Sequence, residues 1–124
     1  MTETQIPVPQ EYSTYLLDDK IPFHIIIYTI MPFLIIYVTH PSKPEAARIT
    51  SELLKKRIIA CANYIPIESV YWWEGFMTNS DEIATLYKTR VENWDIVRTT
   101  IESLHIYKTP CIIKLATVEA NESY

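Results

Sequence analysis

Glycine is almost absent from this chain. Only Gly75 occurs in 124 residues, whereas average usage of about 7% would give about nine glycines. The scarcity excludes any site built on a glycine-rich, anion-binding loop. The one glycine ends the stretch VYWWEG, which contains two of the three tryptophans. We expect Gly75 to form a bulge or close-approach point where an aromatic strand bends or meets another backbone.

Cysteine is scarce as well. Cys61 and Cys111 lie fifty residues apart, with neither a CxxC motif nor Cys/His spacing of the zinc-finger kind. Two free thiols in a reducing cytoplasm are the favoured interpretation, with a disulfide as the alternative.

An excess of basic residues is also missing. The chain has 11 Lys and Arg against 15 Asp and Glu, for a net charge of −4. Nucleic acid is therefore excluded as the main partner, because phosphate binding needs a basic face. The hydrophobic share of 48% and the charged share of 21% are those of a globular protein, and the length fits one domain.

The first residues lack the basic segment of a signal peptide. We assign residues 1–31 to an N-terminal extension of uncertain structure and residues 32–124 to the folded domain. Met31 is an alternative natural start, because the compact domain begins beside it.

An apolar run of eighteen residues, Ile21–Val38, has the length of a transmembrane helix. Two prolines and a histidine interrupt it, and its β-branched residues favour strands. We expect two extended segments, Ile25–Ile30 and Phe33–Thr39, and keep a membrane anchor as the alternative.

The rest of the domain alternates helical and extended patterns. Ser42 and Glu45 form a capping box before a helix that ends in Lys55, Lys56 and Arg57. A second capping box, Thr89 and Glu92, opens another helix. Its apolar residues are Trp94, Val97, Ile101 and Leu104.

Extended segments fill the intervals. We expect a long bent strand over 59–77, a turn at 78–81, a return strand over 82–89 and a last strand over 111–119. The order βαββαβ predicts an α+β, ferredoxin-like fold, with a four-stranded antiparallel sheet and both helices on one face. Right-handed crossovers place the first and third strands in the centre.

Missing motifs exclude several functions that other proteins of this fold have. A heavy-metal-transport domain needs CxxC after the first strand, and an RNA-recognition motif needs aromatic residues interleaved with basic ones; neither pattern is present. We find no nucleophile–base–acid constellation, so we expect no enzyme.

The aromatic stretch predicts self-association. Tyr71 and Trp73 share one face of their strand, and Trp72 shares the other with Val70. Because the helices cover only one face of the sheet, one aromatic set is left for an interface. The alternative is that the N-terminal segment covers the open face.

The blocks ACANYIPIESVYWWEGFM, YKTR, LHIYKTPCIIKL and ANESY resemble, in this order, the CutA family of divalent-cation tolerance proteins. The resemblance covers about Pro32–Tyr124. It implies a tight homotrimer with the architecture of P-II signalling proteins, and copper as the metal. Tyr71, Trp72 and Trp73 would then lie at the trimer interface.

Three features depart from the family pattern. The family loop His-Pro-Tyr-Glu is here His105, Ile106, Tyr107 and Lys108, and the position after the loop proline, commonly glutamate, is Cys111. These changes favour sulfur and nitrogen over oxygen ligands. Family members also usually continue past the ESY equivalent with a tryptophan-containing segment.

Candidate ligands follow from the residues and the resemblance together. The metal candidates are His105, Cys111, Cys61 and Glu74; the candidates for a ligand in a cleft between subunits are Lys88, Tyr107 and Lys108. Each has a structural alternative: a helix C-cap for His105, a small buried hydrophobe for each cysteine, and a surface ion pair for Lys88. Cys61 and Cys111 fall on opposite sheet edges, roughly 14 Å apart, too far for a disulfide within one protomer.

We therefore expect a cytoplasmic, non-catalytic homotrimer that binds copper or another divalent metal ion. The alternative is a P-II-like regulatory trimer that binds a small anionic ligand in its intersubunit clefts. A third possibility is an adaptor trimer whose metal binding is incidental.

Overall fold

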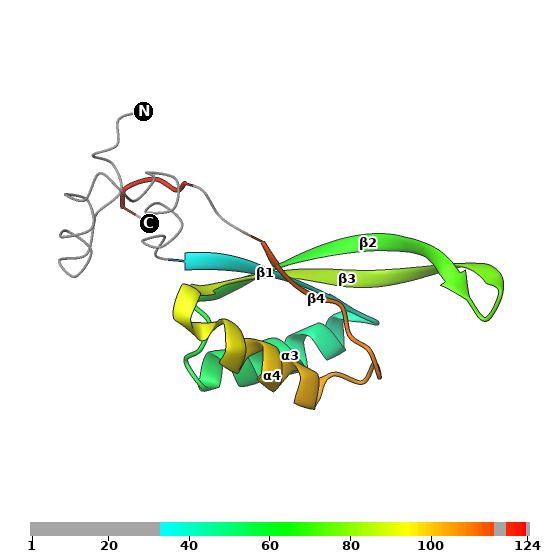
Figure 1. Ribbon diagram of the computed structural model, residues 1–124, viewed down its shortest axis with the longest axis horizontal. Coiled ribbons are helices and arrows are strands. Elements are labelled where there is room, and N and C mark those ends of the chain that lie inside the picture. The colour runs from blue at the N-terminus through cyan, green and yellow to red at the C-terminus, as the bar shows by residue number, and fades with distance from the viewer. Residues whose placement is uncertain (1–32, 116–118, 124) are drawn as a thin grey trace, which may run out of the picture.

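The computed structural model describes residues 33–115 and 119–123. Four antiparallel strands form one sheet in the order β2-β3-β1-β4, and both helices cover the same face of it (Figure 1). This arrangement confirms the α+β fold and the two central strands. Along the chain the elements are β1 (Phe33–His40), α3 (Lys43–Lys55), β2 (Cys61–Trp73), β3 (Phe76–Arg90), the 3₁₀ turn η3 (Val91–Asn93), α4 (Trp94–Leu104) and β4 (Ile112–Leu115). The segment Ile25–Ile30, expected to be extended, lies outside the described residues.

The core lies between the sheet and the helices. Alternate residues of β1 are buried, as expected for a strand with only one face packed on helices. The buried apolar core residues include Leu34, Ile36 and Val38 of β1, Ile49 and Leu53 of α3, Tyr87 of β3, and Val97 and Ile101 of α4.

The two helices begin differently. Ser42 caps α3 as predicted: its Oγ accepts a hydrogen bond from the Glu45 N–H at 3.3 Å. The second predicted capping box is wrong. Thr89 belongs to β3, and its hydroxyl donates to the Ile58 carbonyl at 2.6 Å. That bond ties the end of β3 to the segment after α3, so the Thr89 hydroxyl does not cap a helix. The 3₁₀ turn η3 separates β3 from α4.

The β2–β3 hairpin turns at Glu74 and Gly75, not at residues 78–81 as predicted. Its last pair is Trp73 with Phe76, and both turn residues have positive φ, 48° and 82°. Positive φ at both central positions is the signature of a type I′ turn, whose twist matches that of the strands. An added Cβ at Gly75 would meet no atom within 4 Å. Glycine is therefore required for its backbone conformation, and the expected close approach is wrong.

Gly75→Ala is expected to lower the free energy of unfolding by about 1–2 kcal/mol, because alanine is strained at positive φ. Gly75→Asn is the matched control, since asparagine tolerates this conformation far better. Denaturant unfolding at equal protein concentration compares the two. Equal stability of the alanine variant and the wild type would contradict the turn assignment.

The hairpin projects beyond the rest of the domain (Figure 1). His40 with Ile83 is the last pair between β1 and β3, so residues 76–82 pair with β2 alone. Tyr71, Trp72 and Trp73 are 41%, 72% and 62% exposed. The prediction that helices cover one aromatic set is wrong for this hairpin, because the aromatic residues lie past the end of β1, where both faces of the two-stranded ribbon are open.

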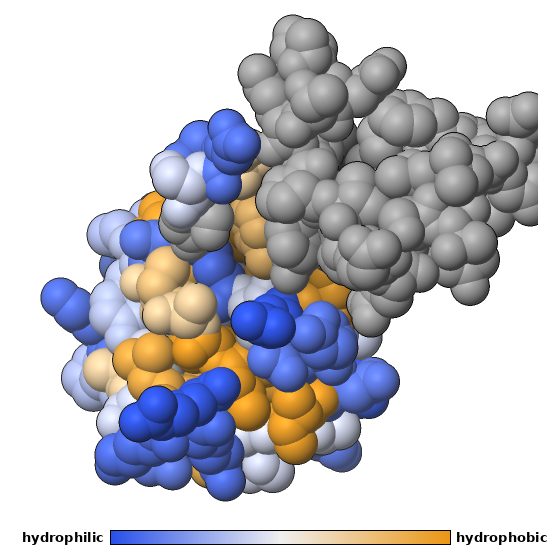
Figure 2. All heavy atoms as spheres, turned by 90° about the vertical axis from the view of Figure 1, so that its left-hand side faces the viewer, coloured by the Kyte–Doolittle hydropathy of each residue, from blue (hydrophilic) through white to orange (hydrophobic). Residues whose placement is uncertain are grey.

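Two further features concern the surface outside the hairpin. No helix in residues 33–115 and 119–123 is long and apolar enough to cross a membrane. At the end of the molecule opposite the hairpin, apolar side chains reach the surface between polar ones (Figure 2).

Candidate functional site

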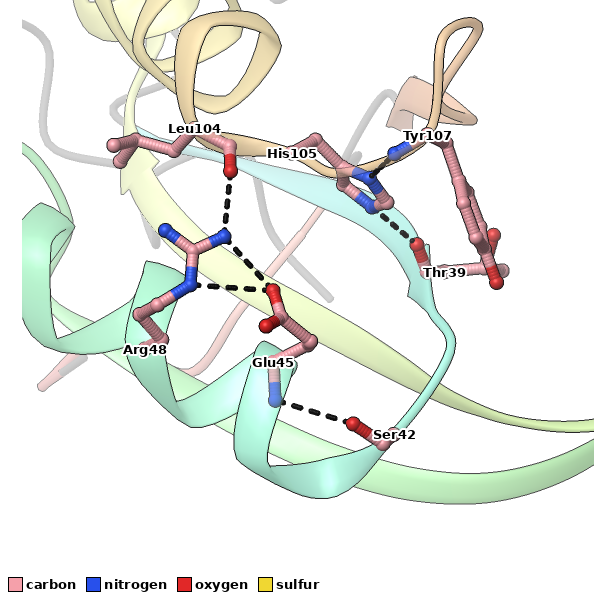
Figure 3. Close-up of polar contacts among 7 residues, drawn as sticks. All are labelled: Thr39, Ser42, Glu45, Arg48, Leu104, His105 and Tyr107. Carbon is pink, nitrogen blue, oxygen red and sulfur yellow. Dashed lines mark hydrogen bonds and ion pairs between the residues drawn. The ribbon is translucent and has the colours of Figure 1, made fainter.

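The first turn of α3 and the last turn of α4 are held together by Arg48. Its guanidinium donates to Glu45 Oε2 at 2.8 and 3.2 Å and to the Leu104 carbonyl at 2.6 Å (Figure 3). The carbonyl is one of those that a helix C-terminus leaves without a partner. The loop of residues 106–111, which carries several of the predicted ligands, therefore starts from a fixed helix end.

His105 follows α4 directly and uses both ring nitrogens. Its Nδ1 accepts the Tyr107 N–H at 3.0 Å, and its Nε2 lies 2.8 Å from the Thr39 carbonyl (Figure 3). Because Nδ1 accepts, Nε2 must carry the proton and donate to Thr39. The ring thus joins the start of the loop to the end of β1.

A second histidine is stacked on the first. His40 is fully buried, and its ring lies 5.2 Å from that of His105 at an interplanar angle of 17°. The hydroxyl of Thr85 donates to the Val38 carbonyl and can therefore accept from His40 Nε2 at 3.1 Å. Nδ1 of His40 has no partner in the described structure. Burial, with the nearby His105 second, lowers the pKa of His40 to about 4.

Tyr107 reaches from the loop to the sheet. Its ring lies 4.7 Å from that of His105, and its hydroxyl donates to Glu82 Oε2 at 2.7 Å. Burial, followed by the bond to Glu82, raises the pKa of Tyr107 well above its usual range. Burial and the Glu82 charge likewise raise the pKa of the Cys111 thiol. Tyr107 and Cys111 therefore lie in one partly shielded region beside the Glu82 carboxylate.

The comparisons with known proteins agree on one family. The family model for the CutA1 divalent ion tolerance protein matches residues 34–124. The divalent-cation tolerance protein CutA of Thermococcus kodakarensis is 38% identical over 94 residues, covering 76% of this chain and 90% of the relative.

The chain belongs to the CutA1 family.

Solved structures of CutA proteins share its fold. A structure described as the periplasmic divalent cation tolerance protein CutA of Archaeoglobus fulgidus is 40% identical, with a TM-score of 0.71 over 73% of this chain and 89% of that one. CutA1 of Oryza sativa is 34% identical, with a TM-score of 0.72 over 76% of this chain and 87% of that one.

Within this CutA1 fold the four predicted metal ligands do not come together. Glu74 lies in the turn at the hairpin tip, Cys61 begins the edge strand β2, and Cys111 precedes the opposite edge strand β4. Both cysteines are free thiols. No three His, Cys, Asp or Glu side chains in the described ranges group as a metal site.

The three predicted cleft residues are divided as well. Tyr107 and Lys108 share the loop, and Lys108 is exposed. Lys88 lies on β3 in register with Cys61 on one side and Ile35 on the other. It therefore shares the sheet face that the helices leave uncovered.

Sequence reasoning missed Glu82, Thr39 and the role of His40. Glu82 was assigned only to a return strand, and nothing local marks its bond to Tyr107, 25 positions away. His40, the last residue of β1, is fully buried. Its alternation with the buried residues of β1 was the signal that could have placed its ring in the core.

Proposed function

We propose that this CutA1-family chain acts in divalent-cation tolerance by binding copper or another divalent metal ion, without catalysing a reaction. The observation that carries the proposal is the match of the family model to residues 34–124, together with relatives named divalent-cation tolerance proteins. Those names describe a response to cations and mention no reaction.

The metal ligands follow from the free donors of the chain. Cys61, Cys111 and Glu74 have thiol or carboxylate groups that can take a metal ion. We leave His105 out of the proposed ligands, because both of its ring nitrogens make hydrogen bonds to the backbone. As no group of three such donors forms in residues 33–115 and 119–123, the binding we propose uses water or donors from another subunit to complete the coordination.

We also propose that the chain assembles as a homotrimer through its hairpin. The large exposed side chains at the hairpin tip support this arrangement: Val70, Tyr71, Trp72, Trp73, Phe76 and Met77 are 41–75% exposed. An apolar surface of this kind on one projecting element is typical of an interface. The free cysteines are consistent with a cytoplasmic location, which cell fractionation would test.

Native mass spectrometry with and without one equivalent of Cu²⁺ per chain tests the proposal. We expect a trimer that gains three copper ions, and a loss of bound copper in Cys111→Ser. A trimer that gains no copper, and no other divalent ion when each is added in turn, would contradict the metal role and leave the assembly standing. A monomer would contradict the assembly.

A further inference from the structure

The β2–β3 hairpin leaves the body of the domain at one definite position. Ile83 still pairs with His40 of β1, whereas Glu82, the preceding residue, pairs only with Ile67 of β2. A two-stranded hairpin is marginally stable at best by itself in water. The direction of this hairpin therefore depends on what holds its root, at Glu82.

The contact at that root comes from the loop between α4 and β4. Tyr107, in the loop between α4 and β4, donates its hydroxyl to the Glu82 carboxylate at 2.7 Å. A hydrogen bond to an ionised acceptor is about twice as strong as one between neutral groups. The pKa values agree with a shielded bond, since burial and Glu82 both raise that of Tyr107.

Tyr107 is itself held at its backbone and its ring. Its N–H donates to His105 Nδ1, its ring lies against the His105 ring, and His105 Nε2 donates to the Thr39 carbonyl (Figure 3). Thr39 pairs with Ala84, two residues past Glu82. These contacts close a ring of interactions from β1 through His105 and Tyr107 to β3 and back to β1.

We propose that Tyr107 is a positioning residue that braces the root of the hairpin through Glu82, so that the loop of residues 106–111 and the aromatic hairpin move as one unit. The loop carries Lys108 and Cys111, and the tip carries Trp72 and Trp73. A ligand that shifts the loop would thereby shift the hairpin and, in the proposed trimer, the packing of the tips between subunits. The brace itself does not depend on the proposed metal binding or on the trimer.

Amide hydrogen exchange followed by NMR on the full-length protein, without added metal, tests the brace. In Tyr107→Phe we expect the amides of residues 67–69 and 80–82 to exchange about tenfold faster, the effect of losing one charge-assisted hydrogen bond in a partly exposed place. The core amides of Ile36 and Tyr87 should keep their wild-type rates.

Tyr87→Phe is the matched control. It also removes one tyrosine hydroxyl, whose bond to Thr50 is 3.0 Å long and buried, and the ring contact of Tyr87 is with His40 in the core. We expect it to speed exchange in the core. If Tyr107→Phe changed the root and the core equally, or changed neither, the bond would add only general stability or nothing, and the brace would be refuted.

Variants at Glu82 complete a double-mutant cycle with Tyr107→Phe. Glu82→Leu should reproduce the effect of Tyr107→Phe, and the double variant should exceed neither single one. Glu82→Gln keeps an acceptor oxygen and should have the smaller effect. Additive effects of Tyr107→Phe and Glu82→Leu would show that the two side chains act independently, which would overturn the proposal.

Discussion

Replacing both Trp72 and Trp73 by serine is expected to dissociate the proposed trimer into folded monomers. The two side chains are 72% and 62% exposed in the single chain. Buried aromatic residues at an interface typically contribute about 2–4 kcal/mol each, so the loss of two weakens association about a thousandfold or more. Because the tip contacts neither helix nor β1, the fold of the monomer should persist.

Sedimentation velocity over a dilution series measures this effect, with circular dichroism to follow the fold. Ile96→Ser is the matched control, since Ile96 is 49% exposed on α4, away from the hairpin. If the double variant still formed a trimer with unchanged dissociation, the subunit interface would lie elsewhere. Dissociation in the control alone would do the same.

Acid is expected to destabilise the fold through His40. Its pKa is about 4 in the folded chain against 6.5 for an unperturbed histidine, so between these values the unfolded state binds the extra proton. Stability from this group is complete above pH 6.5, falls as the pH drops toward 4, and is constant below that. A pKa difference of about 2.5 between the two states corresponds to about 3 kcal/mol in the free energy of unfolding.

Denaturant unfolding at a fixed protomer concentration, from pH 7.5 to 4, measures the slope for the wild type and for His40→Gln. Carboxylates also titrate near pH 4, so the difference between the two proteins isolates the histidine. In the variant we expect stability to fall much less between pH 6.5 and 5 than in the wild type. Parallel curves would contradict the assignment of a neutral, buried His40.

The groups around His40 explain why its neutral form is favoured. His105 and Arg48 oppose a positive charge there, whereas Glu45 and Glu82 favour one. Burial is the largest cause and outweighs both carboxylates. The unpartnered Nδ1 adds to the same effect, since a proton on it would have no acceptor in the described structure.

The amino-acid sequence by itself determined the elements and their order. Apolar alternation in β1, the Ser42 cap and the periodic apolar faces of both helices are local patterns, and each depends on residues a few positions apart. The antiparallel sheet and its central strands then follow from chain order and crossover handedness. The VYWWEG stretch was also correctly singled out as carrying exposed aromatic residues, although only one of its two faces was expected to be open.

The position of the turn could not be predicted in the same way. Residues 78–81 have the composition of a turn, yet Asn79 and Ser80 pair with Val70 and Ser69 across the ladder. The choice depends on register along the whole hairpin, and shifting it by one residue would move every side chain to the opposite face. Only the pairing of β2 with β3 decided it.

The candidate site was decided by tertiary structure even more completely. Glu82 and Tyr107, or His40 and His105, are separated by 25 and 65 positions and meet because β1, β3 and the end of α4 converge. The sequence supplied donors of the right types and placed Cys61 and Cys111 on opposite sheet edges, but it could not tell that Glu74 lies at the hairpin tip, apart from both. Nor could it tell that both ring nitrogens of His105 hydrogen-bond to backbone groups. Side-chain chemistry is a local property, whereas proximity between distant residues exists only once the sheet has formed.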